Sequence, residues 1–228
     1  MINIAIIITT YYRPDKMSKY YLERNLNSLK NQTYRNFKIF LIGDKYEEEQ
    51  EFNLFSKMCD NMYCENLTHA KERERYKGIK LWCSGGVNAC NVGIKKALLD
   101  GYDWIINMDH DDYFLPTHIE DITKLITKNS VFVCSNSNYK NLSILPNISG
   151  KYIPVGGNLV KSSACVNFSK INITFRDVYE EEGRIDASDS DFWNRLNRII
   201  IDNNYESFCT GNTTCIHDEE GYTNIAFN

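Results

Sequence analysis

The amino-acid sequence lacks any long hydrophobic run. Its longest apolar stretch, from Ile4 to Ile8, is far shorter than the ~20 residues that a membrane-spanning helix needs. The first residues also lack the basic segment and the small-residue cleavage site of a signal peptide. From these absences we expect a cytoplasmic protein without a membrane span.

Proline and glycine are scarce, with Pro 4 and Gly 12 in 228 residues, which excludes a collagen-like or low-complexity chain. Hydrophobic residues make up 43% and charged residues 25%, the balance of an ordered globular protein. A chain of this length buries roughly 70% of its unfolded surface on folding. We therefore predict one domain, residues 1–228, with a full hydrophobic core.

An excess of positive charge is also missing. The 26 Lys and Arg residues face 30 Asp and Glu residues, which gives a net charge of -4. A chain of this charge lacks the strong positive field that attracts nucleic acid. We therefore expect no nucleic-acid partner.

The eight cysteines show no metal-binding or disulfide pattern. None forms a C-x-x-C pair, and none stands at zinc-finger spacing from a histidine. We predict reduced thiols and no structural zinc.

Segments typical of strands and helices alternate along the chain. The β-branched run in residues 3–9 is typical of a strand buried on both faces of a parallel sheet. A helix and a second strand follow it at the spacing of a crossover connection. This alternation predicts an α/β fold with a mostly parallel sheet. The predicted strands are residues 3–9, 36–42, 102–108, 130–134 and 207–210, and the predicted helices are residues 18–29, 47–58, 85–99, 116–126 and 191–201, with a mixed segment at 158–168.

The most distinctive feature is an acidic cluster, N-M-D-H-D-D, at the end of the strand predicted over residues 102–108. Three carboxylates this close repel one another unless a cation or solvent compensates them. Ligands bind at the carboxyl ends of strands in open α/β sheets, and Asp109 and Asp111 are spaced to share one divalent ion. The alternative is an acidic turn that caps the next helix through Asp112 or Thr117.

Six segments resemble, in order, the inverting glycosyltransferases of family 2. The Q-T-Y-x-N-F motif and the D-x-D-D at a strand end are each moderately specific, and together, at this spacing, they are a strong signature. The resemblance covers residues 3–217. The matching segments are IAIIITTYYR, NSLKNQTYRNFKIFLIGD, GGVNACNVGIKKAL, WIINMDHDDYFLP, FRDVYEEEGRIDASDSDFWNRL and CIH.

The resemblance implies a single domain of the GT-A fold, in which helices flank a mixed, mostly parallel sheet. Residues 1–112 would form a Rossmann-like half that binds a nucleotide-sugar, and residues 113–228 would form the acceptor-binding half. The implied reaction is a metal-dependent transfer, with inversion, from a nucleoside-diphosphate sugar to an acceptor hydroxyl. UDP-sugar is the expected donor, and a glycan, a lipid-linked molecule or a protein is the expected acceptor.

The resemblance also implies roles for residues at the strand ends. Thr9 and Tyr11 match the nucleotide-binding turn, and Asp44 matches the aspartate that contacts the base. Asp109 matches a nucleotide-sugar contact and, with Asp111, the D-x-D that holds Mn²⁺ or Mg²⁺ on the diphosphate. For Tyr11, plain packing is the alternative.

Two further roles lie late in the sequence. Asp189 matches the acidic residue that acts as general base, and His217 matches a residue that binds the metal in some members. The alternative for Asp189 is a cap of the helix that follows it, and the alternative for His217 is a surface histidine whose hydrogen bonds are satisfied.

Three positions depart from the family pattern. Asp44 stands in G-D-K-Y where the family often has D-D-G-S, Cys90 replaces a frequent arginine, and Ser188 replaces the first residue of an acidic pair. These changes affect the expected details of donor binding, not the enzyme class.

A basic segment precedes Gly85 and Gly86. It either supplies positive charge to a diphosphate or forms a solvated helix face, and the interleaved Glu72 and Glu74 favour the solvated face. Its basic residues are Lys71, Arg73, Arg75, Lys77 and Lys80.

Two other functions remain as alternatives. A nucleotidyltransferase acting on sugar phosphates would use a similar metal, but usually carries a Gly-rich basic loop after its first strand, and T-T-Y-Y-R at residues 9–13 is not one. A non-catalytic relative would bind the nucleotide-sugar without the metal or the base.

Overall fold

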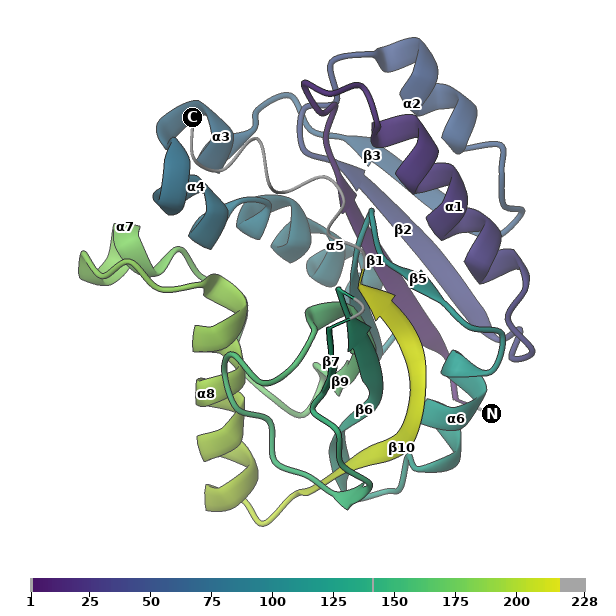
Figure 1. The fold of residues 1–228 in the computed structure, drawn as a ribbon, viewed down its shortest axis with the longest axis vertical. Coiled ribbons are helices and arrows are strands. Elements are labelled where there is room, and N and C mark those ends of the chain that lie inside the picture. The colour runs from purple at the N-terminus through teal and green to yellow at the C-terminus, as the bar shows by residue number, and fades with distance from the viewer. Residues whose placement is uncertain (1, 141, 218–228) are drawn as a thin grey trace.

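The computed structural model describes residues 2–140 and 142–217 (Figure 1). One sheet runs through the domain in the order β3-β2-β1-β4-β9-β6-β10-β5, with β7 paired to β6 and β8 paired to β10. Its strands are β1 (Ile4–Thr10), β2 (Phe37–Gly43), β3 (Met62–Asn66), β4 (Trp104–Asp109), β5 (Tyr113–Phe114), β6 (Ser130–Tyr139), β7 (Ser143–Leu145), β8 (Gly150–Lys151), β9 (Ala164–Asn167) and β10 (Glu206–His217).

The sheet is mixed but mostly parallel, which confirms the predicted fold class. Strands β3, β2, β1 and β4 are parallel neighbours, and β6 and β10 also pair in parallel. Strand β9 lies antiparallel between β4 and β6 and joins the two parallel parts.

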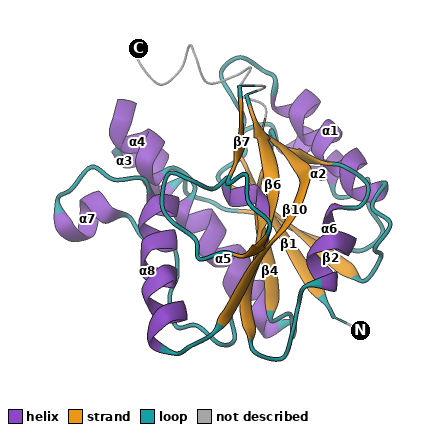
Figure 2. Cartoon of the chain, turned by 60° about the horizontal axis from the view of Figure 1, so that its bottom comes forward, coloured by secondary structure: helices purple, strands orange, loops and turns teal. Residues whose placement is uncertain are grey.

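Helices cover both faces of the sheet, as Figure 2 shows. On one face, α5 packs on β1 and β2, and α8 belongs to the same buried cluster as Ala5 and Ile7. On the other face, α1 and α6 belong to the cluster that holds the alternate isoleucines of β1. The helices are α1 (Ser18–Lys30), α2 (Glu49–Phe55), α3 (Lys71–Arg75), α4 (Gly78–Ser84), α5 (Val87–Leu99), α6 (His118–Lys124), α7 (Val178–Glu182) and α8 (Ser188–Asp202), with a short 3₁₀ helix at Lys161–Ser163.

Strand β1 shows why this core forms. Every residue from Ile4 to Ile8 is fully buried, and complete burial of each large aliphatic side chain contributes ~1.5–3 kcal/mol. A run that is apolar on both faces is stable only in the middle of a covered sheet, which is where β1 lies.

The structure corrects several predicted boundaries. The last strand is not the short segment 207–210 but all of β10, whose second half is polar and irregular in register near Gly211, where φ is +82°. Helix α8 begins at Ser188 rather than at residue 191, because Asp189 and Asp191 lie in its first turn, where carboxylates favour the helix dipole. Strand β3 was not predicted, since the sequence MYCEN has no clear alternation and every residue is only partly buried.

The ends of three parallel strands meet at one edge. Thr9 pairs in register with Asp109 on β4 and with Ile42 on β2, and the Asp44 N–H donates to the Thr10 carbonyl at 2.7 Å. The loops after β1, β2 and β4 therefore surround a common space, as the crevice rule for open α/β sheets predicts.

The eight cysteines are all free thiols in the structure. Within residues 2–140 and 142–217, no helix combines the length and apolar character of a membrane span.

Candidate active site

A cleft with a volume of about 600 Å³ opens at this edge of the sheet. The residues assigned to nucleotide and metal on the β1, β2 and β4 loops all line it. These are Thr9, Tyr11, Asp44, Asp109 and Asp111. The sequence therefore predicted correctly that these five side chains share one cleft, although their roles remain predictions.

A second cavity of about 340 Å³ adjoins the first, and both are lined by Trp82, Gly85, Gly86 and Asp109. Asp189 and His217 line this second cavity. The early and late segments of the sequence thus meet around two joined spaces.

Buried hydrogen bonds fix the turn that carries the acidic cluster. The Asn25 side-chain amide, fully buried on α1, donates to the carbonyls of Asp109 and Asp112 at 3.0 and 2.9 Å. The Asp109 N–H donates to the Ser162 hydroxyl at 2.9 Å. These contacts hold the carboxylates on a rigid backbone.

The acidic cluster does not cap the next helix through a side chain. Helix α6 has Thr117 at its N-cap position without a side-chain capping bond, and Asp112 instead contacts His217. Burial, together with the neighbouring Asp112 and Asp109 carboxylates, raises the pKa of Asp111 to about 7. The buried Oδ2 atoms of Asp111 and Asp112 accept no hydrogen bond from protein groups.

His217 is tied to the acidic cluster from the end of β10. Its Nδ1 lies 2.8 Å from Asp112 Oδ1, and its ring stacks on Tyr139 at a centroid distance of 5.0 Å. Burial lowers the pKa of His217, but the Asp112 carboxylate outweighs it and raises the pKa to about 9. His217 is therefore a largely buried histidine with a satisfied hydrogen bond, and its role as a metal ligand stays a prediction.

Lys161 is a site residue that the sequence did not reveal. Its Nζ lies 2.6 Å from Asp109 Oδ1, and it lines the second cavity with Asp189. Although burial raises the pKa of Asp109, the Lys161 ammonium lowers it more strongly, to a net value below the ordinary one. No spacing rule connects positions 109 and 161, because only the insertion of β9 beside β4 brings them together.

The acidic cluster fits a divalent ion that is shared with a substrate. Within the described parts of the chain, no three His, Cys, Asp or Glu side chains are already gathered as a ligand set. Mg²⁺ and similar hard ions often take only one or two carboxylates and complete their shell with phosphate oxygens and water. Asp111 Oδ2 matches that arrangement, because it lies at the wall of the cleft and accepts no hydrogen bond from the described residues. Arg13 Nη1, 3.7 Å away, would share this carboxylate with the ion.

Arg73 corrects the interpretation of the basic segment. Its Nε donates to Asp44 Oδ2 at 3.0 Å, and its guanidinium carbon lies 5.0 Å from the Tyr11 ring centroid. The buried Glu72 carboxylate accepts a hydrogen bond from the Asn88 N–H at 3.1 Å, at the start of α5. The prediction of a solvated helix face is therefore wrong for Arg73 and Glu72, because α3 turns these two side chains inward.

The exposed face of this segment agrees with the prediction. Lys71 and Arg75 are exposed and pair with Glu180 of α7 at 3.2 and 2.7 Å. Lys77 is also exposed, but it lines the cleft with Arg73, so the alternative of positive charge beside a diphosphate stays a prediction for it.

Asp189 lies in the first turn of α8, half-buried at the wall of the second cavity. The N-cap residue is Ala187, and Asp189 Oδ1 accepts from the adjacent Ser190 N–H at 2.7 Å. Burial raises the pKa of Asp189, and the charge of Lys161 partly offsets this effect. A carboxylate held this way is available to accept a proton.

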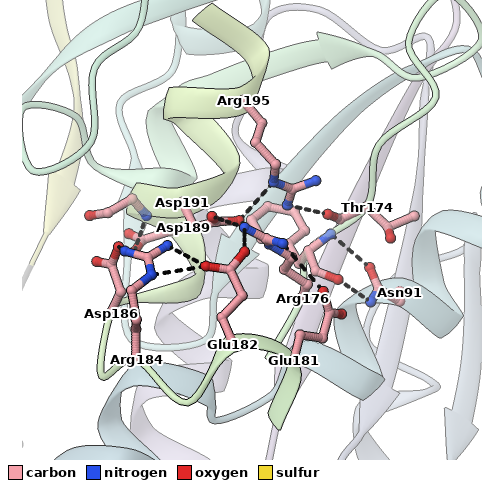
Figure 3. Close-up of polar contacts among 12 residues, drawn as sticks. Asn91, Thr174, Arg176, Glu181, Glu182, Arg184, Asp186, Asp189, Asp191 and Arg195 are labelled. Carbon is pink, nitrogen blue, oxygen red and sulfur yellow. Dashed lines mark hydrogen bonds and ion pairs between the residues drawn. The ribbon is translucent and has the colours of Figure 1, made fainter. Parts of the chain in front are cut away.

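Asp191, two residues later, is in a very different position. Figure 3 shows its carboxylate held between Arg176 and Arg195. Arg176 donates to both oxygens at 2.8 and 2.7 Å, and Arg195 adds a bond of 2.7 Å. Arg176 also pairs with Glu182 of α7 at 2.7 Å, so the network joins α7 to the start of α8.

The geometry predicts a structural role for Asp191. We expect Asp191→Asn to destabilise the fold by ~1–3 kcal/mol, less than for a fully buried pair because Arg176 and Arg195 remain about one-fifth exposed. Urea denaturation measures this change. Unchanged stability would show that the network does not hold α8.

Comparison with known proteins identifies the family to which this chain belongs. Residues 5–195 match the sequence profile of the family described as Glycosyl transferase family 2. The chain belongs to glycosyl transferase family 2. It is a glycosyltransferase of the GT-A fold, a class that binds nucleotide-sugars.

One relative is similar along almost its entire length. An uncharacterized glycosyltransferase of Acanthamoeba polyphaga mimivirus is 30% identical over 240 residues, covering 96% of this chain and 95% of the relative.

Two solved structures share the fold. S. aureus TarS in complex with UDP has a TM-score of 0.67 at 16% identity, covering 95% of this chain. The mannosyltransferase PcManGT from Pyrobaculum calidifontis, in complex with GDP-Man and Mn²⁺, has a TM-score of 0.62 at 12% identity, covering 96%. This chain spans 60% of the TarS structure and 58% of PcManGT.

Proposed function

We propose that this glycosyltransferase transfers a sugar from a UDP-sugar to an acceptor hydroxyl, with inversion and with a divalent metal ion. The observation that carries the proposal is the relation between the two cavities. Asp109 and Asp111 line the cleft at the strand ends, Asp189 lines the adjoining cavity, and Asp109 belongs to both.

The first cleft supplies the groups that a nucleotide needs. Tyr11 offers an aromatic face, and Asp44, whose buried Oδ1 has no hydrogen-bond partner, offers an acceptor for a base N–H. In this structure Arg73 covers Asp44, so we expect its side chain to shift when the base binds. The structures of TarS with UDP and with UDP-GlcNAc support UDP as the nucleotide.

Asp109 and Asp111 would hold the metal. His217 would fix the position of the neighbouring Asp112 carboxylate through their hydrogen bond. A bound Mn²⁺ or Mg²⁺ offsets the negative charge that develops on the departing diphosphate. The Mn²⁺ in the PcManGT structure supports this part of the proposal.

Asp189 performs the proton chemistry. As the acceptor oxygen attacks the anomeric carbon, Asp189 takes the hydroxyl proton, and the bond between that carbon and the diphosphate breaks on the opposite side. One displacement of this kind inverts the anomeric centre and needs no covalent enzyme intermediate. Lys161 lowers the pKa of Asp189 relative to burial alone, which keeps the carboxylate ready as a base.

The two alternatives are less well supported. Family membership assigns glycosyl transfer rather than nucleotidyl transfer. A non-catalytic relative would not need Asp189 at a cavity wall adjoining the donor cleft.

The test is a screen of nucleotide-sugars for slow hydrolysis in the presence of Mn²⁺. We expect one UDP-sugar to be hydrolysed above the background rate, with release of UDP, and EDTA to stop the reaction. Preferred hydrolysis of a GDP-sugar would contradict the donor assignment, and binding of every donor without turnover would favour the non-catalytic relative.

A further inference from the structure

Trp82 is an exposed aromatic side chain at the junction of the two cavities. It is 55% exposed, and it lines both the donor cleft and the cavity that contains Asp189. The other two tryptophans, Trp104 and Trp193, are 7% and 2% exposed and belong to the core. Single exposed apolar side chains are common, but Trp82 is distinguished by its place in the walls of both cavities, where its amphipathic ring can contact a bound molecule.

The surroundings of Trp82 combine apolar and polar groups. Leu159 and Phe175 line the second cavity together with Asp189, Lys161 and several further polar side chains. A pyranose ring has the same two-sided character, because its C–H bonds form an apolar face and its hydroxyls form a polar rim. An indole ring covers that face, while carboxylate and ammonium groups bind the rim.

Contacts connect the helix that carries Trp82 to the start of α8. The Lys80 ammonium on α4 lies 3.8 Å from the centroid of Tyr179 on α7, and Tyr76, just before α4, packs edge-on against the same ring at 5.8 Å. Arg176 pairs with Glu182 of α7 and with Asp191 of α8, and so ties these two helices together. This chain of contacts links α4 to the helix that carries Asp189, and a sugar subsite needs such support from neighbouring elements.

We propose that Trp82 is the stacking platform for the acceptor and that the acceptor is a carbohydrate. Its terminal sugar ring lies on the indole and directs one hydroxyl toward Asp189. This inference rests on the proposed function and narrows the acceptor class from any hydroxyl-bearing molecule to a saccharide.

The experiment compares Trp82→Ala and Trp82→Phe with wild type. Ile79→Ala is the matched control, because Ile79 is 46% exposed on the same helix and lines neither cavity. The probes are methyl glycosides of glucose, galactose, mannose and the two common N-acetylhexosamines. Binding is followed by tryptophan emission and by protection from acrylamide, since only Trp82 among the tryptophans is exposed.

We expect at least one glycoside to change the emission of wild type and of Ile79→Ala, but not that of Trp82→Ala. With the UDP-sugar found by the hydrolysis screen, the acceptor KM of Trp82→Ala should rise about tenfold more than its donor KM. Trp82→Phe should keep an acceptor KM close to that of wild type, because a phenyl ring still covers the sugar face.

Three outcomes overturn the proposal. A larger effect on the donor KM than on the acceptor KM would make Trp82 part of the nucleotide site. Equal kinetics in Trp82→Ala and Ile79→Ala would show that Trp82 has no role in acceptor binding. If no glycoside changed the tryptophan emission of the wild-type protein, a saccharide acceptor would be rejected. Because emission and acrylamide protection need no turnover, they test the platform even where the hydrolysis screen finds no donor.

Discussion

Asp189→Asn should reduce turnover by ~10²–10⁴-fold, the usual cost of losing a general base. The side chain lies in the wall of the second cavity and accepts the Ser190 N–H, a bond that an asparagine oxygen can keep, so the substitution mainly removes a proton acceptor. Asparagine has nearly the same shape, and any change in stability should be at most about 1 kcal/mol. Steady-state kinetics with a defined donor and acceptor measure the effect, which should appear in kcat rather than in the donor KM.

Asp186→Asn is the matched control for this substitution. Asp186 lies just before α8, its side chain is 34% exposed, and it pairs with Arg184 rather than lining either cavity. Its replacement should leave turnover close to wild type. If Asp189→Asn retains activity within about threefold of wild type while Asp186→Asn does not, the base has been assigned to the wrong carboxylate.

Asp191 is not an equivalent substitute for Asp189. Its oxygens are already occupied by two guanidinium groups, which lower its pKa overall although burial opposes them. The variants Asp189→Asn and Asp191→Asn therefore separate an effect on turnover from an effect on stability within one helical turn. Asp189→Asn should lose turnover and keep stability, whereas Asp191→Asn should lose stability first.

The parallel part of the fold could be predicted from the sequence because local pattern and tertiary position agree there. The run from Ile4 to Ile8 is apolar on both faces, and its strand lies between two others with helices above and below. Thr9, Asp44 and Asp109 each follow or end a predicted strand, and this position alone predicts the cleft that they share.

The remaining site residues depend on contacts that no local pattern records. Lys161 reaches Asp109 only because β9 inserts antiparallel beside β4. Arg73 faces inward because α3 is a single short turn whose orientation is set by contacts with Asp44 and the start of α5. Charge patterning describes the average environment of such a helix, not the one side chain that points toward the cleft.

Binding of UDP should depend on a divalent ion and on Asp111. We expect Mn²⁺ to tighten UDP binding by about tenfold or more, equivalent to ~1.4 kcal/mol or more, and Asp111→Asn to remove most of that gain. The reason is the Asp111 Oδ2 atom, a buried carboxylate oxygen at the cleft wall that no protein hydrogen bond satisfies. Calorimetric titration of UDP with Mn²⁺ and with EDTA measures both effects.

The unfolding temperature of Asp111→Asn shows whether the variant has lost metal binding alone or has lost its fold. Burial and the neighbouring carboxylates raise the pKa of Asp111 to about 7, so its ionised form is unfavourable in the folded protein near neutral pH. A neutral asparagine removes that repulsion but also the 3.7 Å ion pair with the buried Arg13, so we expect Asp111→Asn to remain folded and to unfold close to the wild-type temperature. Asp100→Asn, which changes an exposed carboxylate paired with Lys38 and Lys96, should leave the metal effect intact. Equal UDP affinity with EDTA and with Mn²⁺ in the wild-type protein would reject the metal bridge, because the cleft would then hold the diphosphate through its own cations alone.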